Sequence, residues 1–197
     1  MNLWFWVTHP RAAVARGRYW WWEKRNPDKP WLTPAAVAFL DAHLKPAMTG
    51  LEFGSGRSTA WYAGKLHRLT SVEHHAEWRA RVVEMLARRN ISNVEVRLVP
   101  LDHPAEEPER ATYDPLPAYV AVATGLPDES LDLVVVDGHY RSQCIAAVVD
   151  KLRSGGLLLV DDADRWPGAA PPVPAGWPEV SRTTNGIKST VIWRKPG

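Results

Sequence analysis

The sequence has little cysteine, no long apolar run and almost no net charge. Cys144 is the single cysteine, so an internal disulfide is excluded and a reducing, cytoplasmic setting is expected. No apolar run reaches the ~18 residues of a membrane span, and the first residues lack the apolar core of a secretory signal. A net charge of only +2 does not indicate a dedicated nucleic-acid binder, so no nucleic-acid partner is expected.

Tryptophan, in contrast, is abundant at the start of the chain. Six of the 11 tryptophans lie within the first 31 residues, among many arginines and lysines: Trp4, Trp6, Trp20, Trp21, Trp22 and Trp31. Residues 1–32 are therefore interpreted as an appendage, which could be a lid over a substrate pocket, a helix at a lipid surface or a partner surface. Its apolar and basic residues do not separate into two helical faces, which disfavours contact with a membrane surface. Residues 33–197 are expected to form the main domain.

From residue 33 onward, helical and strand patterns alternate, which predicts an α/β fold. Strands are expected at 49–56, 68–75, 93–100, 131–138 and 157–163, followed by a hairpin of 179–184 and 189–195. Helices are expected at 34–44, 57–66, 76–90, 117–126 and 140–156. The prediction is a doubly wound parallel sheet with helices on both faces, whose ligands bind beyond the carboxyl ends of the strands.

The first strand ends in an acid followed by a glycine turn. Gly54, Ser55 and Gly56 follow Glu52-Phe53, and glycines there let a ligand approach the backbone. A dinucleotide fingerprint would need a third glycine where this chain has Thr59, which disfavours an NAD(P)-dependent oxidoreductase. A carboxylate at this position would repel a pyrophosphate but suits an ammonium group. An amino-acid head is therefore the expected ligand part.

The second strand also ends in an acid. Glu73 comes 21 residues after Glu52, and an acid at this strand end can accept both hydroxyls of a ribose. An amino acid and a nucleoside within one ligand indicate S-adenosylmethionine.

Residues 50–78 resemble the first motif and the second-strand acid of class I S-adenosylmethionine-dependent methyltransferases. Residues 126–141 and 152–164 resemble that family's fourth- and fifth-strand motifs, and the likeness covers roughly 33–194. It is greatest to small, poorly characterised members with Asp-Gly after the fourth strand. The resemblance implies a Rossmann-like sheet of about seven strands, the last antiparallel.

The resemblance also implies a role for each residue of the cofactor site. Gly54, Ser55 and Gly56 would line the methionine part, and Glu52 would hold the amino group directly or through water. Glu73 would bind the ribose, and Asp102, after the third strand, would face the adenine. The same site is expected to include Ser58, beside the glycine turn, and His74, near the adenosine.

Two groups are candidates for the chemistry itself. His139 follows Asp137-Gly138 at the fourth strand end, and histidine can take a proton near neutral pH. Asp137, Asp161 and Asp162 lie at adjacent strand ends and could converge on a Mg²⁺-like ion, as in metal-dependent O-methyltransferases. The catalytic lysine of the catechol enzymes has no counterpart here. In the alternative, Asp137 orders the cofactor loop and Asp161 caps a turn.

The leading expectation is a methyltransferase that acts on oxygen or nitrogen of a small molecule. A non-catalytic cofactor-binding scaffold is an alternative, because fold does not guarantee activity. An NAD(P)-dependent oxidoreductase is the less favoured alternative.

Overall fold

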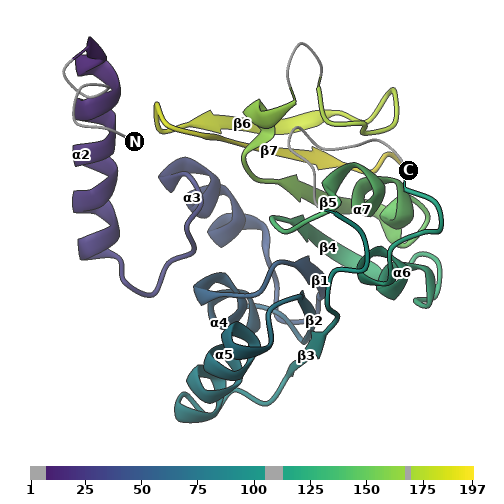
Figure 1. Ribbon diagram of the computed structural model, residues 1–197. Coiled ribbons are helices and arrows are strands. Elements are labelled where there is room, and N and C mark those ends of the chain that lie inside the picture. Colours follow the sequence, from purple (N-terminus) through teal and green to yellow (C-terminus); the bar gives the residue numbers. More distant parts are fainter. Residues whose placement is uncertain (1–7, 105–112, 167–169) are drawn as a thin grey trace.

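A computed structural model describes residues 8–104, 113–166 and 170–197 of the chain. Its centre is a seven-stranded sheet of order β3-β2-β1-β4-β5-β7-β6 (Figure 1). The strands are β1 (Thr49–Phe53), β2 (Arg68–Glu73), β3 (Val94–Leu98), β4 (Leu131–Val136), β5 (Leu152–Val160), β6 (Glu179–Thr184) and β7 (Ser189–Arg194).

The first five strands are parallel, whereas β7 runs antiparallel to both β5 and β6. The predicted Rossmann-like sheet with an antiparallel last strand is therefore confirmed. Strand order reverses between β1 and β4, and such a switch point opens a crevice at the carboxyl ends of the strands.

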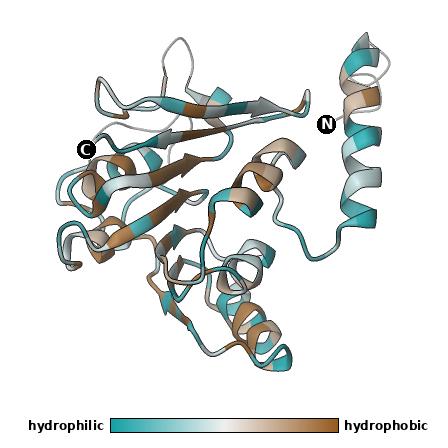
Figure 2. Ribbon diagram, turned by 180° about the vertical axis from the view of Figure 1, so that it is seen from behind, coloured by the Kyte–Doolittle hydropathy of each residue, from teal (hydrophilic) through white to brown (hydrophobic). Residues whose placement is uncertain are grey.

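Helices cover both faces of the sheet (Figures 1 and 2). The helices are α2 (Pro10–Arg25), α3 (Pro34–His43), α4 (Arg57–Ala63), α5 (Ala76–Arg88), α6 (Ala118–Thr124) and α7 (Arg141–Val148). Successive side chains of a strand point to opposite faces, and β4 shows this directly. Leu133 and Val135 join the core cluster of α3 and α4, whereas Val134 and Val136 join that of α6 and α7. Burial on both faces explains the unbroken apolar run of this strand.

Helix α3 begins where the sequence predicts. The hydroxyl of Thr33 accepts a hydrogen bond from the backbone N–H of Ala36 at 3.3 Å, and Pro34 occupies the first turn. Val37 and Leu40 are buried on the face that packs against the sheet.

The helix predicted at 140–156 is too long, and the strand after it begins earlier than predicted. Helix α7 ends at Val148, and β5 already begins at Leu152. Leu152 pairs with Leu131, and the register then shifts before Leu133. The glycine pair at 155–156 therefore lies inside an irregular strand, where Gly155 has φ +80°.

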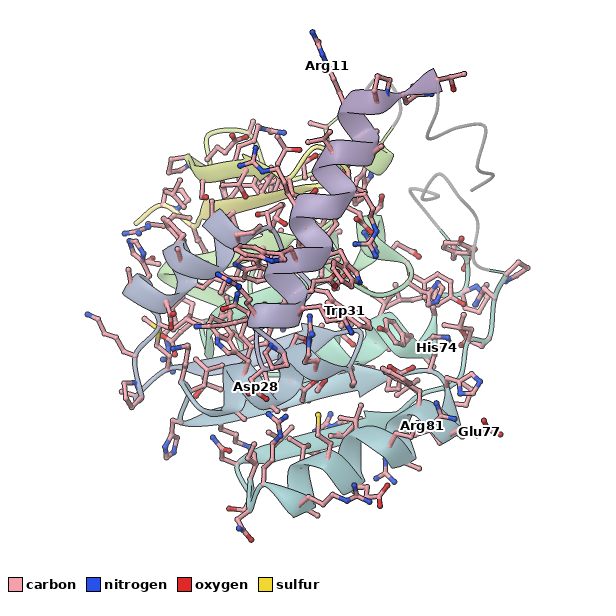
Figure 3. The ribbon with its side chains drawn as sticks, turned by 90° about the vertical axis from the view of Figure 1, so that its left-hand side faces the viewer. Arg11, Asp28, Trp31, His74, Glu77 and Arg81 are labelled. Atoms are coloured by element: carbon pink, nitrogen blue, oxygen red, sulfur yellow. The ribbon has the colours of Figure 1, made fainter. Side chains whose placement is uncertain are left out.

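The tryptophan-rich segment contains helix α2, which stands beside the β6–β7 hairpin and α3 (Figures 1 and 3). Tyr19 is its buried residue, and its hydroxyl donates to the carbonyl of Leu32 at 3.1 Å. Trp20 and Trp21 are about half exposed. Trp4 and Trp6 lie outside the described residues. None of the helices in the described ranges is long and apolar enough to cross a bilayer.

Candidate functional site

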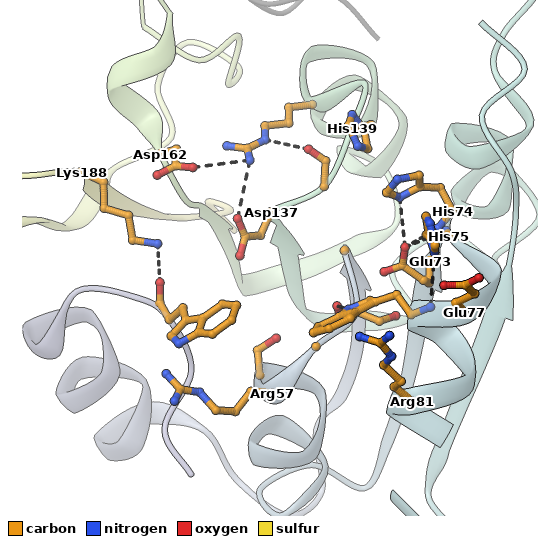
Figure 4. Close-up of a pocket in the computed structure, with 18 residues that line it drawn as sticks. Arg57, Glu73, His74, His75, Glu77, Arg81, Asp137, His139, Asp162 and Lys188 are labelled. Atoms are coloured by element: carbon orange, nitrogen blue, oxygen red, sulfur yellow. Dashed lines mark hydrogen bonds and ion pairs between the residues drawn. The ribbon is translucent and has the colours of Figure 1, made fainter. Parts of the chain in front are cut away.

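A cavity of about 690 Å³ opens at the carboxyl ends of β1, β2 and β4, at the switch point of the sheet (Figure 4). Six of the residues predicted for the cofactor line it: Gly54, Ser55, Gly56, Ser58, Glu73 and His74. Asp137, His139 and Asp162 line it as well. The structure thus brings together most of the predicted site from three strand ends.

Gly54 is the residue at which the turn after β1 requires glycine. Its φ is +97°, a conformation that side chains rarely adopt. A Cβ atom there would lie 2.7 Å from the carbonyl oxygen of Asp137 at the end of β4. The turn and the fourth strand end are therefore in direct backbone contact, which shapes the floor of the cavity.

Glu52 does not line the cavity but lies fully buried beneath the turn. Its carboxylate accepts hydrogen bonds from the hydroxyls of Ser58 at 2.5 Å, Thr59 at 2.6 Å and Ser71 at 2.6 Å. Thr59 also accepts the backbone N–H of Gly56 at 2.9 Å. The direct contact predicted between Glu52 and a cofactor amino group is therefore not available in this geometry. The carboxylate instead ties α4 to β2 and holds the glycine turn.

Burial raises the pKa of Glu52 to about 7, against the three hydroxyls that lower it. In the unfolded chain this carboxyl loses its proton near 4.5, so between these pH values the folded protein binds more protons. The free energy of unfolding therefore falls as pH rises, by about 2 kcal/mol between pH 5 and 7. We expect Glu52→Gln to remove this fall, measured by urea unfolding at each pH.

The control for this measurement is Glu84→Gln, which changes an exposed acid of α5. Only the difference between variant and wild-type protein is compared, because other groups also titrate in this range. A difference that stays constant from pH 5 to 7 in Glu52→Gln would contradict the raised pKa.

Glu73 ends β2 and is almost fully buried at the cavity wall. One carboxylate oxygen, Oε1, accepts the backbone N–H groups of His74 at 2.9 Å and His75 at 2.8 Å, and lies 3.0 Å from the Nδ1 atom of His74. Among the described residues, all contacts of this carboxylate are to Oε1, so Oε2 could accept hydroxyl groups of a ligand in the cavity.

His74 and His139 come from different strand ends and pack against each other at the cavity wall. Their ring centroids lie 4.5 Å apart and the rings are nearly perpendicular. His139 is partly buried. The predicted acid–base candidate therefore lies against the histidine that follows the second-strand acid, and it lines the cavity (Figure 4).

The three acids predicted for a metal do converge, since one oxygen from each of Asp137, Asp161 and Asp162 lies within 4.8 Å of the others. Two cations already lie among them. Lys188 bonds Asp161, and the Nη2 atom of Arg141 lies 3.6 Å from Asp137 and 3.7 Å from Asp162. A divalent ion would have to displace both cations, so this donor set does not fit a metal.

The cluster nevertheless has an unusual electrostatic character. Burial raises the pKa of Asp161, against the ammonium of Lys188 and the hydroxyl of Thr190, which donates at 2.6 Å. Burial and the carboxylate of Asp161 likewise raise the pKa of Asp137, against Arg141. Lys188 also donates to the carbonyl of Trp31. The cluster therefore joins the ends of β4 and β5 to the segment before α3.

Asp102 was expected to face the adenine because it follows β3. The structure instead places it outside the cavity. Its Oδ2 atom accepts the backbone N–H of Ala118 at 2.9 Å, and its Oδ1 atom lies 3.0 Å from His103. The carboxylate thus satisfies the first turn of α6 instead.

Sequence reasoning missed several residues that line the cavity, including Arg57, Trp78, Arg81 and Lys188. The indole N–H of Trp78 donates to the carbonyl of Ser55 at 2.8 Å, so this ring lies against the glycine turn. The spacing of Trp78 and Arg81, three residues apart at the start of α5, was an available signal, because such residues share a helix face.

The sequence matches a known protein family. A family model described as a methyltransferase domain matches residues 51–163. No curated protein sequence matches this chain.

Many solved structures share the fold. A putative methyltransferase, yhhF, from Escherichia coli matches with a TM-score of 0.62 at 15% identity, over 86% of this chain and 92% of that one. A putative methyltransferase from Streptococcus mutans, in complex with S-adenosylhomocysteine, gives 0.60 at 12% identity, over 82% and 97%. A putative rRNA-methylase from Clostridium thermocellum gives 0.59 at 13% identity, over 82% and 95%. At these identities the likeness shows the fold alone.

Proposed function

Because the chain belongs to the methyltransferase domain family, we propose that it transfers a methyl group from S-adenosylmethionine to an oxygen or nitrogen atom of a small molecule. One observation carries the proposal. Glu73, at the end of β2, and the glycine turn after β1 line the same cavity. They would accept a ribose and an amino-acid head, which are two parts of this cofactor.

The residues present fit the ribose and the methionine part of the cofactor. The Oε2 atom of Glu73 would accept the ribose hydroxyls, and Gly54, Ser55 and Gly56 would lie along the methionine part. Glu52 would act indirectly, by holding the turn through Ser58 and Thr59. When bound, the cofactor supplies an electrophilic methyl group, and the protein's task is alignment.

His139 is the residue that we propose to accept a proton from the substrate. It lines the cavity at the end of β4, and neutral imidazole is a suitable base near neutral pH. Asp137, two residues earlier, forms an ion pair with Arg141 and contacts the glycine turn through its backbone. Asp137 would therefore position this loop rather than hold a metal.

Two alternatives are less well supported. A nicotinamide cofactor would need close packing at the position of Thr59, whose hydroxyl instead bonds Glu52 and Gly56. A non-catalytic scaffold would not need a histidine at the cavity surface. A small-molecule substrate accords with the cavity volume and the low net charge, and the buried Cys144 accords with a cytoplasmic setting.

Thermal unfolding with added ligand tests the proposal. At ten times its dissociation constant, S-adenosylhomocysteine should stabilise the protein by about 1.4 kcal/mol, which raises the melting temperature by about 3–6 °C. NAD at the same concentration should have no effect. Stabilisation by NAD alone would favour the oxidoreductase, and no response to either compound would contradict a cofactor site.

A further inference from the structure

Arg57 differs in its partners from Arg141 and Lys188, two other cations that line the cavity. Arg141 and Lys188 each contact carboxylates, whereas Arg57 makes no ion pair with any residue in the described part of the chain. It is the first residue of α4, directly after the glycine turn, and it lines the cavity. Its guanidinium therefore lies at the site without an ion-pair partner among the described residues, although Glu23 and Asp28 act on its charge.

One edge of the Arg57 guanidinium is occupied and the other is vacant. The Nη1 atom donates to the carbonyl of Pro27 at 3.2 Å. The Nε and Nη2 atoms are buried and have no hydrogen-bond partner among the described residues. These two N–H groups form the parallel pair that binds a carboxylate or phosphate through two hydrogen bonds.

The vacant edge lowers the stability of the free protein, because its two buried N–H donors have lost hydrogen bonds to water and gained no others. The two acids that act on the charge of Arg57 form their ion pairs with other residues: Glu23 pairs with Arg16, and Asp28 pairs with Arg89. An incoming anion would satisfy both donors and the charge together.

We propose that Arg57 binds a carboxylate or phosphate group of the substrate, so that the acceptor of the methyl group is an anionic small molecule. This inference rests on the proposed methyltransferase function. The ring of Trp31 lies 5.0 Å from the Arg57 guanidinium carbon and is 54% exposed. Because Nε and Nη2 are buried, an anion would reach them only after a neighbouring side chain moves, and Trp31 is the exposed neighbour that packs on this guanidinium.

The position of Arg57 favours the substrate over the cofactor as the source of the anion. Its guanidinium contacts Pro27 and Trp31, which belong to the segment between α2 and α3. Figure 4 shows it on the side of the cavity where Lys188 lies, far from Glu73. The cofactor's own carboxylate belongs to its amino-acid head, which would lie along the glycine turn just before Arg57. The contacts of the guanidinium to Pro27 and Trp31 are therefore what favours the substrate.

Calorimetric titration of the protein saturated with S-adenosylhomocysteine tests this proposal, with phenyl phosphate and benzoate as probes and benzyl alcohol as their neutral analogue. We expect both anions to bind wild-type protein at least tenfold more tightly than benzyl alcohol. Arg57→Gln should weaken anion binding at least tenfold and leave benzyl alcohol unchanged. Arg57→Lys, which keeps the charge but not the two-donor edge, should give an intermediate loss.

Arg81→Gln is the matched control, because Arg81 lines the same cavity from α5 and is exposed. It should change anion binding by less than twofold. Equal anion binding by wild-type protein and Arg57→Gln, or no anion binding at all, would overturn the inference.

The source of the anion is tested by titrating S-adenosylhomocysteine and 5′-methylthioadenosine, which lacks the amino-acid head, into wild-type protein and Arg57→Gln. We expect both affinities to be unchanged by the substitution. If Arg57→Gln lowered the affinity for S-adenosylhomocysteine alone, Arg57 would bind the cofactor carboxylate and the inference would be overturned. Failure of wild-type protein to bind S-adenosylhomocysteine would instead overturn the proposed function, and the inference with it.

Discussion

Gly54→Ala should lower the free energy of unfolding by about 2–5 kcal/mol and abolish cofactor binding. The left-handed conformation at φ +97° contributes about 1–2 kcal/mol of this loss. The remainder, about 1–3 kcal/mol, comes from overpacking, because the new Cβ would lie 2.7 Å from the carbonyl oxygen and 2.9 Å from the carbonyl carbon of Asp137. Both atoms belong to backbone, so neither can rotate away. Urea unfolding measures the first effect and titration with S-adenosylhomocysteine the second.

Gly155→Ala is the control that separates these two causes. Gly155 has φ +80°, but a Cβ there would meet nothing within 4 Å. We expect it to cost only the conformational part, about 1–2 kcal/mol, and to leave cofactor binding intact. Equal losses of stability in the two variants would show that the contact between the turn and β4 is unimportant.

Glu73→Ala should weaken binding of S-adenosylhomocysteine by about 2–3 kcal/mol, the scale of lost hydrogen bonds to a charged group. The carboxylate is buried at the cavity wall, and its contacts to His74 and His75 use only Oε1. The substitution therefore removes the proposed acceptor of the ribose hydroxyls. Calorimetry on the variant and wild-type protein measures the change.

Two control variants distinguish the loss of a ligand contact from a disturbed structure. Glu77→Ala removes an exposed acid that lines the same cavity, and it should leave the affinity nearly unchanged. Glu73→Gln keeps an amide oxygen for the backbone N–H groups of His74 and His75, so it isolates the loss of charge. An unchanged dissociation constant in both Glu73 variants would refute the ribose assignment.

The parts of this structure that depend on local pattern could be predicted from the sequence. Thr33-Pro34 marks a helix start, and the apolar run of β4 marks a strand covered on both faces. The acids at 137, 161 and 162 follow adjacent strand ends, so their convergence also follows from strand order. The glycine pair at 155–156 misled the prediction, because glycine serves both as a helix stop and as a bulge residue.

The residues that were missed or misassigned depend on tertiary contacts. The sequence could not show that three hydroxyls close over Glu52, since Ser71 comes from another strand. The sequence also could not show that Lys188, from the β6–β7 hairpin, bonds Asp161. This contact is one reason why the three acids do not fit a metal. Arg57 reads as an ordinary helix-start residue until its guanidinium is seen against Trp31.

A crystal structure of the protein with S-adenosylhomocysteine would show directly whether the cavity is the cofactor site. We expect the ribose hydroxyls within hydrogen-bond distance of the Glu73 carboxylate and the methionine part along Gly54, Ser55 and Gly56. Ligand density elsewhere on the molecule, or an empty cavity at saturating ligand in a well-ordered crystal, would contradict it.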